Sequence, residues 1–145
     1  MHEKYRDGID QVITDIDRAE LEISIEMYIF ESDDEWLEVV EALKGEAKRG
    51  VDVKLMVDGL GNRRTPDDFF ENLLNEVIMV RRYNLLHWWT FLISPGRPLQ
   101  KSNHRKLILI DQRIGHIGGM NFGFTDQKTR RFARSFSFLH FENPK

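Results

Sequence analysis

The sequence predicts an α/β fold in which a mixed β-sheet is flanked by helices. Helical apolar spacing alternates with short strand-like runs through the first 83 residues, which is typical of this class. The first strand–helix–strand unit has the length of a parallel β-α-β crossover. A hairpin pattern over residues 106–117 adds antiparallel strands. The 145 residues suit one domain, so we expect a single domain over 1–145.

The first half of the chain supplies two helices and two strands. Glu3–Ala19 has apolar residues at helical spacing, and 21–29 alternates as a half-buried strand does, with its apolar positions at Leu21, Ile23, Ile25, Met27 and Ile29. The segment 31–50 predicts a second helix, with Ser32 or Asp33 as the cap at its start and Gly50 past its end. Residues 51–59 predict the strand parallel to 21–29.

The second half is predicted with fewer regular elements. We expect a helix over Pro66–Asn75 and a strand over 77–83. A long connection, 84–103, precedes the strand Lys106–Ile110, and Arg113–Ile117 forms its hairpin partner across a turn at Asp111 and Gln112. Residues 125–134 suggest a short helix and 135–141 a strand.

Composition excludes several classes of function. The chain has no cysteine, which excludes disulfides and thiolate zinc sites. Its net charge of -3 argues against a nucleic-acid partner. No apolar run approaches the roughly 20 residues of a membrane-spanning helix, and the first residues lack the apolar core of a signal peptide. We therefore expect a soluble or peripheral protein, cytoplasmic or bound to the inner membrane surface.

A group of residues suited to phosphate binding begins at the mouth of the predicted strand 106–110. Side chains alternate along a strand, so His104 and Lys106 should point to the same side. Lysine offers a compact positive charge, and histidine a nitrogen that can attack phosphorus or carry a proton. Gly118 and Gly119 allow a ligand close to the backbone, and Asn121 adds a neutral donor.

These residues also carry a family resemblance. His104-x-Lys106-x4-Asp111 followed by Gly118-Gly119-x-Asn121 resembles the signature of the phospholipase D superfamily. The segments "MYIFESDD", "EAKRGVDVKLMVDGLGNR", "NHRKLILID" and "IGGMNFG" resemble successive parts of the N-terminal catalytic half of bacterial cardiolipin synthases. The resemblance covers about Ala19–Gly123, and we expect residues 124–145 to be a diverged or truncated tail.

The resemblance implies a mechanism and a set of roles. In this superfamily one histidine attacks the phosphodiester to give a phosphohistidine, and a second histidine protonates the leaving alcohol and activates the incoming one. It implies His104 as nucleophile or acid/base and Lys106 and Asn121 as phosphate ligands, with no metal and no cofactor. Asp111 matches the catalytic motif, but strand parity turns it away from His104, so we expect it to stabilise the turn through backbone hydrogen bonds.

Only one complete motif is present, which limits what the chain should do alone. The same histidine cannot be both nucleophile and proton donor to one leaving group. We therefore expect a second motif from a partner domain or from a homodimer, and an inactive chain without it. The acid that usually orients a catalytic histidine beyond the asparagine has no match in the tail. Whether the chain is an active enzyme stays open at this point.

Three functions remain as alternatives. The first is phosphatidyl transfer like that of cardiolipin synthases, on a phosphatidylglycerol-like phospholipid. The second is a homodimeric phosphodiesterase or nuclease of the same superfamily, and the third is a non-catalytic remnant. Trp88 and Trp89 predict either peripheral membrane contact or packing against protein.

The remaining polar positions give no clear prediction of a functional site. Asp58-Gly59-x-Gly61 ends a parallel strand, where ligand clefts tend to lie, but a plain turn is the favoured interpretation. No ligand-like spacing surrounds His87, His116 or His140, so the sequence assigns them no role.

Overall fold

The computed structural model describes residues 2–30, 34–59, 61–62, 65–76, 78–83, 105–118 and 138–143. This part of the chain contains helices α1 (His2–Ile16), α2 (Asp34–Arg49) and α3 (Asp67–Asn75). It also contains strands β1 (Glu22–Met27), β2 (Asp52–Asp58), β3 (Met79–Tyr83), β4 (Leu107–Ile110), β5 (Ile114–Gly118) and β6 (Phe138–Glu142).

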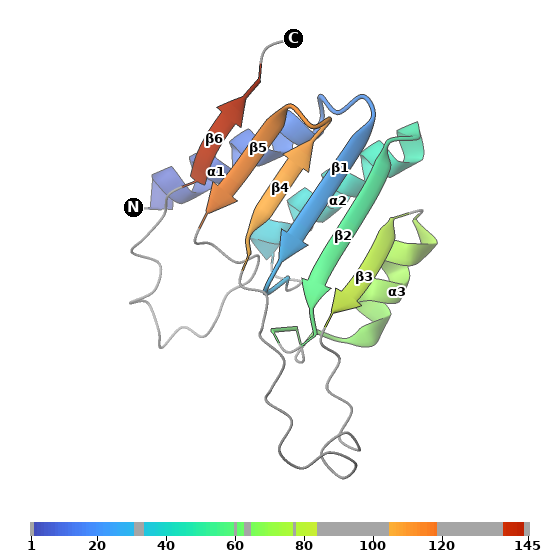
Figure 1. Ribbon diagram of the computed structural model, residues 1–145. Helices are drawn as coiled ribbons and strands as arrows, with labels where there is room; N and C mark the ends of the chain where they lie inside the picture. Colours follow the sequence, from blue (N-terminus) through green and yellow to red (C-terminus); the bar gives the residue numbers. More distant parts are fainter. Residues whose placement is uncertain are drawn as a thin grey trace, which may run out of the picture.

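The strands form one six-stranded mixed sheet in the order β3-β2-β1-β4-β5-β6 (Figure 1). Strands β1, β2 and β3 run parallel to one another. Strand β4 is antiparallel to β1, and β5 and β6 continue the antiparallel half. The structure therefore confirms the predicted mixed sheet and the parallel crossover through α2.

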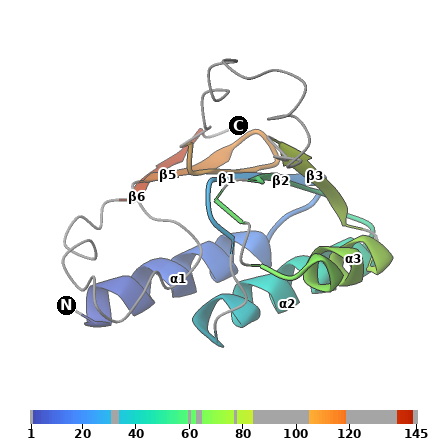
Figure 2. The ribbon, with the colours of Figure 1, turned by 90° about the horizontal axis from the view of Figure 1, so that it is seen from below.

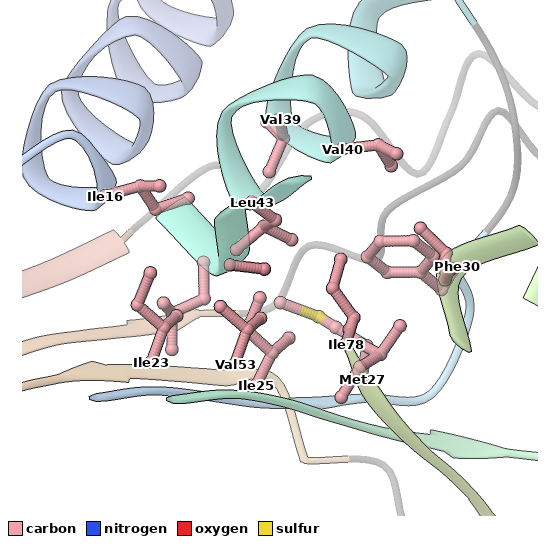
Figure 3. Packing of buried hydrophobic residues seen from close by; sticks show 14 of the residues in the cluster. Ile16, Ile23, Ile25, Met27, Phe30, Val39, Val40, Leu43, Val53 and Ile78 are labelled. Carbon is pink, nitrogen blue, oxygen red and sulfur yellow. The ribbon is translucent and has the colours of Figure 1, made fainter. Parts of the chain in front are cut away.

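The three described helices all lie on one face of the sheet (Figure 2). The core fills the space between the helices and the sheet, because β1, β2 and β4 turn alternate apolar residues toward the helices. Figure 3 shows Ile16 of α1 and Leu43 of α2 above Ile23 and Val53 of the sheet, all of them buried. Within the described residues, no helix has both the length and the apolar character needed to cross a bilayer.

The ends of β1 correct one detail of the predicted pattern. Leu21 is 71% exposed and precedes the strand, and Ile29 follows the strand and is only partly buried. The alternation thus holds for the six residues of β1, whose buried positions are Ile23, Ile25 and Met27. The second helix ends as predicted, since Gly50 has the positive φ of 97° that terminates helices.

The predicted hairpin is confirmed at residues 107–118. Asp111 and Gln112 both have left-handed backbone angles, with φ of 51° and 57°, and the N–H of Arg113 donates to the carbonyl of Ile110 over 2.9 Å. Two left-handed residues match the right-handed twist of paired strands. The strand predicted at 135–141 corresponds to β6, while the connection 84–103 and the helix at 125–134 lie outside the described residues.

Candidate functional site at the carboxyl edge of the sheet

One edge of the sheet collects the ends of several strands. Strands β1 and β2 finish there, β4 begins there and β5 finishes there, because β4 is antiparallel to its neighbour β1 (lower edge in Figure 1). The register pairs Leu107 with Glu26, so Lys106, the residue before β4, lies at the carboxyl end of β1. Ligands of open α/β sheets bind at this kind of edge.

Lys106 is held at this edge in a half-buried position. Its Nζ atom lies 5.9 Å from the centre of the Tyr28 ring, over the face of the ring. Burial lowers the pKa of the Lys106 ammonium from its ordinary value, because desolvation disfavours the charged form. An anionic group that reaches this position would compensate for the hydration that the ammonium has lost.

Gly118 lies beside Lys106 across the hairpin. It is the last residue of β5, and its N–H donates to the carbonyl oxygen of Lys106 over 3.2 Å. The structure therefore brings together the cation and the first glycine of the predicted phosphate-binding set. Arg105, between the two motif positions, is exposed and lies 3.9 Å from the Glu26 carboxylate.

Asp111 lies at the opposite edge of the sheet from Lys106. Its Oδ1 accepts hydrogen bonds from the N–H groups of Leu21 and Glu22 over 2.8 and 2.9 Å, and its Oδ2 accepts one from Glu20 over 2.8 Å. Backbone hydrogen bonding is the role expected of Asp111, although the donors are Glu22, the first residue of β1, and the two residues before it rather than the turn itself. Burial acts to raise the pKa of Asp111, but these hydrogen bonds and the charge of Arg113 outweigh it and lower the pKa.

The turn after β2 also lies at the carboxyl edge. Asp58 is buried, and its Oδ1 accepts a hydrogen bond from the N–H of Gly61 over 3.3 Å. Its carbonyl oxygen accepts from the side-chain amide of Asn62 over 2.7 Å. These bonds close the turn on itself, which supports the plain-turn interpretation over a ligand cleft. In the part of the chain that the structure describes, no three histidine or acidic side chains gather as a metal site would require.

Several predicted site residues fall outside the described residues: His104, Gly119, Asn121, Trp88 and Trp89. The expected shared orientation of His104 and Lys106 therefore stays a prediction, as does the membrane contact through the two tryptophans.

The structure adds residues that sequence reasoning missed. Tyr28 supplies the ring face under Lys106, and Asn62 is completely buried where β1 and β2 end. His116, to which the sequence assigned no role, lies 2.9 Å from Asp15 of α1 in the interior. A weak signal existed for Asn62, since it directly follows the Asp58-Gly59-x-Gly61 turn.

Comparison with protein families and curated proteins gives one consistent result. Residues 12–131 match the family described as cardiolipin synthase, phospholipase-D-like domain. A cardiolipin synthase of Listeria monocytogenes is 34% identical over 122 residues, which cover 84% of this chain and 24% of that protein. The major cardiolipin synthase ClsA of Bacillus subtilis is also 34% identical over 122 residues, covering 81% and 24%. The chain thus spans about a quarter of the length of the curated relatives it matches.

Solved structures agree on the fold. A phospholipase D family member, Nuc from Salmonella typhimurium, is 28% identical with a TM-score of 0.54, covering 78% of this chain and 63% of Nuc. NucT from Helicobacter pylori has a TM-score of 0.61 at 21% identity, covering 81% and 69%, and supports the fold alone.

Proposed function

Because the chain belongs to the phospholipase D superfamily, in the family of cardiolipin synthase domains, we propose that it supplies one half of a phosphatidyl-transfer site. In this proposal His104 is the nucleophile, and Lys106 and Asn121 hold the phosphate oxygens. Gly118 and Gly119 let the phosphate approach the backbone. The substrate is a phospholipid of the phosphatidylglycerol type.

The position of Lys106 carries the proposal. Its ammonium is half-buried at the carboxyl edge of the sheet, and the end of β5 lies beside it. A cation in a partly desolvated position interacts with phosphate more strongly than one in open water. Because Asp111 accepts hydrogen bonds from the backbone at and just before the start of β1, it supports the hairpin that bears Lys106 rather than touching substrate.

The reaction divides into two balanced steps. In the first, a ring nitrogen of His104 bonds to phosphorus while the bond from phosphorus to the leaving glycerol oxygen breaks, and a second histidine gives that oxygen a proton. In the second step, the acceptor alcohol bonds to phosphorus and returns its proton to the second histidine as the phosphorus–nitrogen bond breaks. Lys106 balances negative charge on the phosphate oxygens throughout.

The second histidine belongs to a partner in this proposal. The sequence holds one complete His-x-Lys-x4-Asp motif, so the proton donor comes from another motif-bearing domain or from a second copy of the chain. The cardiolipin synthase relatives, of which this chain matches about a quarter, favour the first source.

A homodimeric phosphodiesterase is the second candidate function. The observation that favours it is the structural similarity to Nuc, a phospholipase D family member of which this chain covers 63%. In this arrangement each copy lends one histidine to a shared site. The net charge of -3 favours a lipid or small phosphodiester over nucleic acid as the substrate.

A substrate with a p-nitrophenolate leaving group tests the half-site directly, because this group departs without protonation. The purified chain is mixed with p-nitrophenyl phosphatidate in detergent micelles. We expect a burst of about one p-nitrophenolate per chain and a phosphatidyl adduct on His104 in the peptide mass spectrum. Phosphatidylglycerol, whose leaving group needs a proton, should give no comparable burst with the chain alone.

The His104→Ala chain is the matched control and should give neither burst nor adduct. Steady turnover of phosphatidylglycerol by the wild-type chain, together with a dimeric molar mass by light scattering, would select the homodimer instead. A wild-type chain that shows no burst and no adduct would overturn both functions and leave the non-catalytic remnant.

Binding to vesicles that contain phosphatidylglycerol tests the predicted peripheral membrane contact. The bound fraction is compared between the wild type and a Trp88→Ser/Trp89→Ser variant.

A further inference from the structure

The contact between Lys106 and Tyr28 joins two segments that are distant in the sequence. Tyr28 directly follows β1, and Lys106 directly precedes β4. The ammonium lies 5.9 Å from the ring centre, within the range where the negative face of an aromatic ring attracts a cation. The attraction opposes the desolvation that lowers the pKa of Lys106. The ring of Tyr28 therefore favours the charged form that phosphate binding requires.

The backbone around Tyr28 is fixed by one buried side chain, that of Asn62. Its Nδ2 atom donates to the carbonyl oxygen of Tyr28 over 2.9 Å and to that of Asp58 over 2.7 Å. Its Oδ1 atom accepts from the N–H of Phe30 over 2.6 Å. Both amide hydrogens and the amide oxygen are thus used, and the two bonds to the 28–30 segment bracket Ile29. Asn62 has no exposed surface, so these bonds do not compete with water.

Gly61 allows this close approach. A Cβ atom added at Gly61 would overlap the carbonyl oxygen of Tyr28, which is the atom that Asn62 binds. Thr65 adds a further bond from its hydroxyl to the carbonyl of Phe30 over 3.3 Å. The turn after β2 therefore packs closely against the segment that follows β1 and binds it through several hydrogen bonds.

From these contacts we propose that Asn62 and Tyr28 are positioning residues for Lys106: Asn62 fixes the end of β1, and the ring of Tyr28 holds the ammonium at the carboxyl edge of the sheet. This inference rests on the proposed function, because the arrangement serves to present a charged Lys106 to phosphate. Neither residue touches the reacting atoms in this proposal. Asn62 acts on Lys106 only through Tyr28.

The amine reactivity of Lys106 measures this arrangement without any turnover. The folded chain is treated with a small acylating reagent across a range of pH, and the labelling of Lys106 is followed by peptide mass spectrometry. Only the uncharged amine reacts, so the profile reports how strongly the ammonium is held. Lys54 on β2, which pairs with Glu22 and Asp52, is an internal reference.

Tyr28→Leu and Tyr28→Phe are the matched pair. Loss of the ring in Tyr28→Leu should raise the labelling rate of Lys106 at neutral pH about threefold, as expected for one cation–π contact near the limit of its range. Tyr28→Phe keeps the ring face and should stay within about twofold of the wild type. Equal changes in both variants, or none in Tyr28→Leu, would overturn the proposal.

Asn62→Ser tests whether Asn62 acts on Lys106 through Tyr28. It should raise the labelling rate of Lys106 in the same direction, and the double variant Tyr28→Leu/Asn62→Ser should show no more than the effect of Tyr28→Leu alone. Additive effects would show that Asn62 does not act through Tyr28. If Asn62→Ser does not fold, the variants Tyr28→Leu and Tyr28→Phe still decide whether the ring holds the ammonium of Lys106. A chain lacking the p-nitrophenolate burst but keeping the Tyr28 effect would refute the proposed function and leave the positioning intact.

Discussion

The Nε2 atom of His116 lies 2.9 Å from Oδ2 of Asp15, and both side chains are almost completely buried. His116 comes from β5 and Asp15 from the last turn of α1, which crosses behind the antiparallel half of the sheet (Figure 1). Gln11, one turn earlier on α1, donates to both oxygens of Asp15 over 3.1 Å. The pair of Asp15 and His116 joins α1 to β5 in the interior, while Gln11 reaches Asp15 from the exposed side of α1.

His116→Phe should destabilise the fold strongly. The substitution leaves the Asp15 carboxylate buried with Gln11 and without its imidazole partner. Leaving a buried polar group without its partner typically costs about 1–3 kcal/mol, because the group keeps its desolvation cost and loses the contact that offset it. Urea unfolding followed by circular dichroism measures the loss as a lower midpoint at unchanged slope.

The double variant Asp15→Leu/His116→Phe is the control for this prediction. Well-packed apolar replacements of a whole buried pair are often neutral or stabilising, so the double variant should recover most of the loss. If the double variant were as unstable as the sum of both single variants, His116 and Asp15 would not act as a pair.

Asp111 should make stability depend on pH at the acidic end. Its pKa is lowered in the folded chain, so its contribution is complete above the unfolded pKa and disappears as the pH falls through the lower, folded pKa. The asparagine in Asp111→Asn cannot titrate. Its Nδ2 group is a donor and would face the N–H of Glu20, whose hydrogen bond Oδ2 of Asp111 accepts, so that bond would be lost. We expect Asn to cost about 1–2 kcal/mol at neutral pH and to lose less stability than the wild type on acidification.

Unfolding by urea at neutral pH and at several values below 4.5 tests the Asp111 prediction. The gap between wild type and Asp111→Asn should narrow as the pH falls. A constant gap over this range would mean that the carboxylate is not held by its bonds to Leu21 and Glu22.

Gln112→Gly should stabilise the hairpin. Gln112 has φ of 57°, and a left-handed conformation costs a residue with a side chain about 1–2 kcal/mol. Glycine removes this strain but loses more entropy on folding, so the net gain should be about 0.5 kcal/mol. Gln112→Val, which tolerates left-handed angles poorly, should lower the urea midpoint. A lower midpoint for glycine as well would show that the exposed bond from Gln112 to Glu22 outweighs the strain.

The periodicity of the sequence was sufficient to predict the sheet and its helices. Ile23, Ile25 and Met27 alternate as a buried strand does, and the crossover length through α2 set β1 parallel to β2. The turn at Asp111 and Gln112 was predictable because it lies between two strand-like runs. The predicted position of Leu21 within the strand is wrong, because alternation alone does not mark where a strand begins, and the first paired residue is Glu22.

The candidate site was predictable only where its residues lie in one motif. Lys106 and Gly118 are twelve positions apart and meet through the hairpin, which the strand pattern implied. Tyr28 and Asn62 reach the same edge from β1 and the turn after β2, and no local pattern connects them to Lys106. The partner of His116 was hidden for the same reason, since Asp15 lies on a helix about a hundred residues earlier.

Lys106→Ala should slow the p-nitrophenolate burst by at least about 100-fold, because it removes one transition-state charge partner of the phosphate. Its fold should persist, since Lys106 lies at the sheet edge and is only half-buried. Arg105→Ala is the matched control: Arg105 is the adjacent cation, but it is exposed and lies near Glu26, so the burst should change less than about threefold. Stopped-flow absorbance gives both rates. Comparable bursts in Lys106→Ala and the wild type would mean that the half-buried ammonium does not face the phosphate.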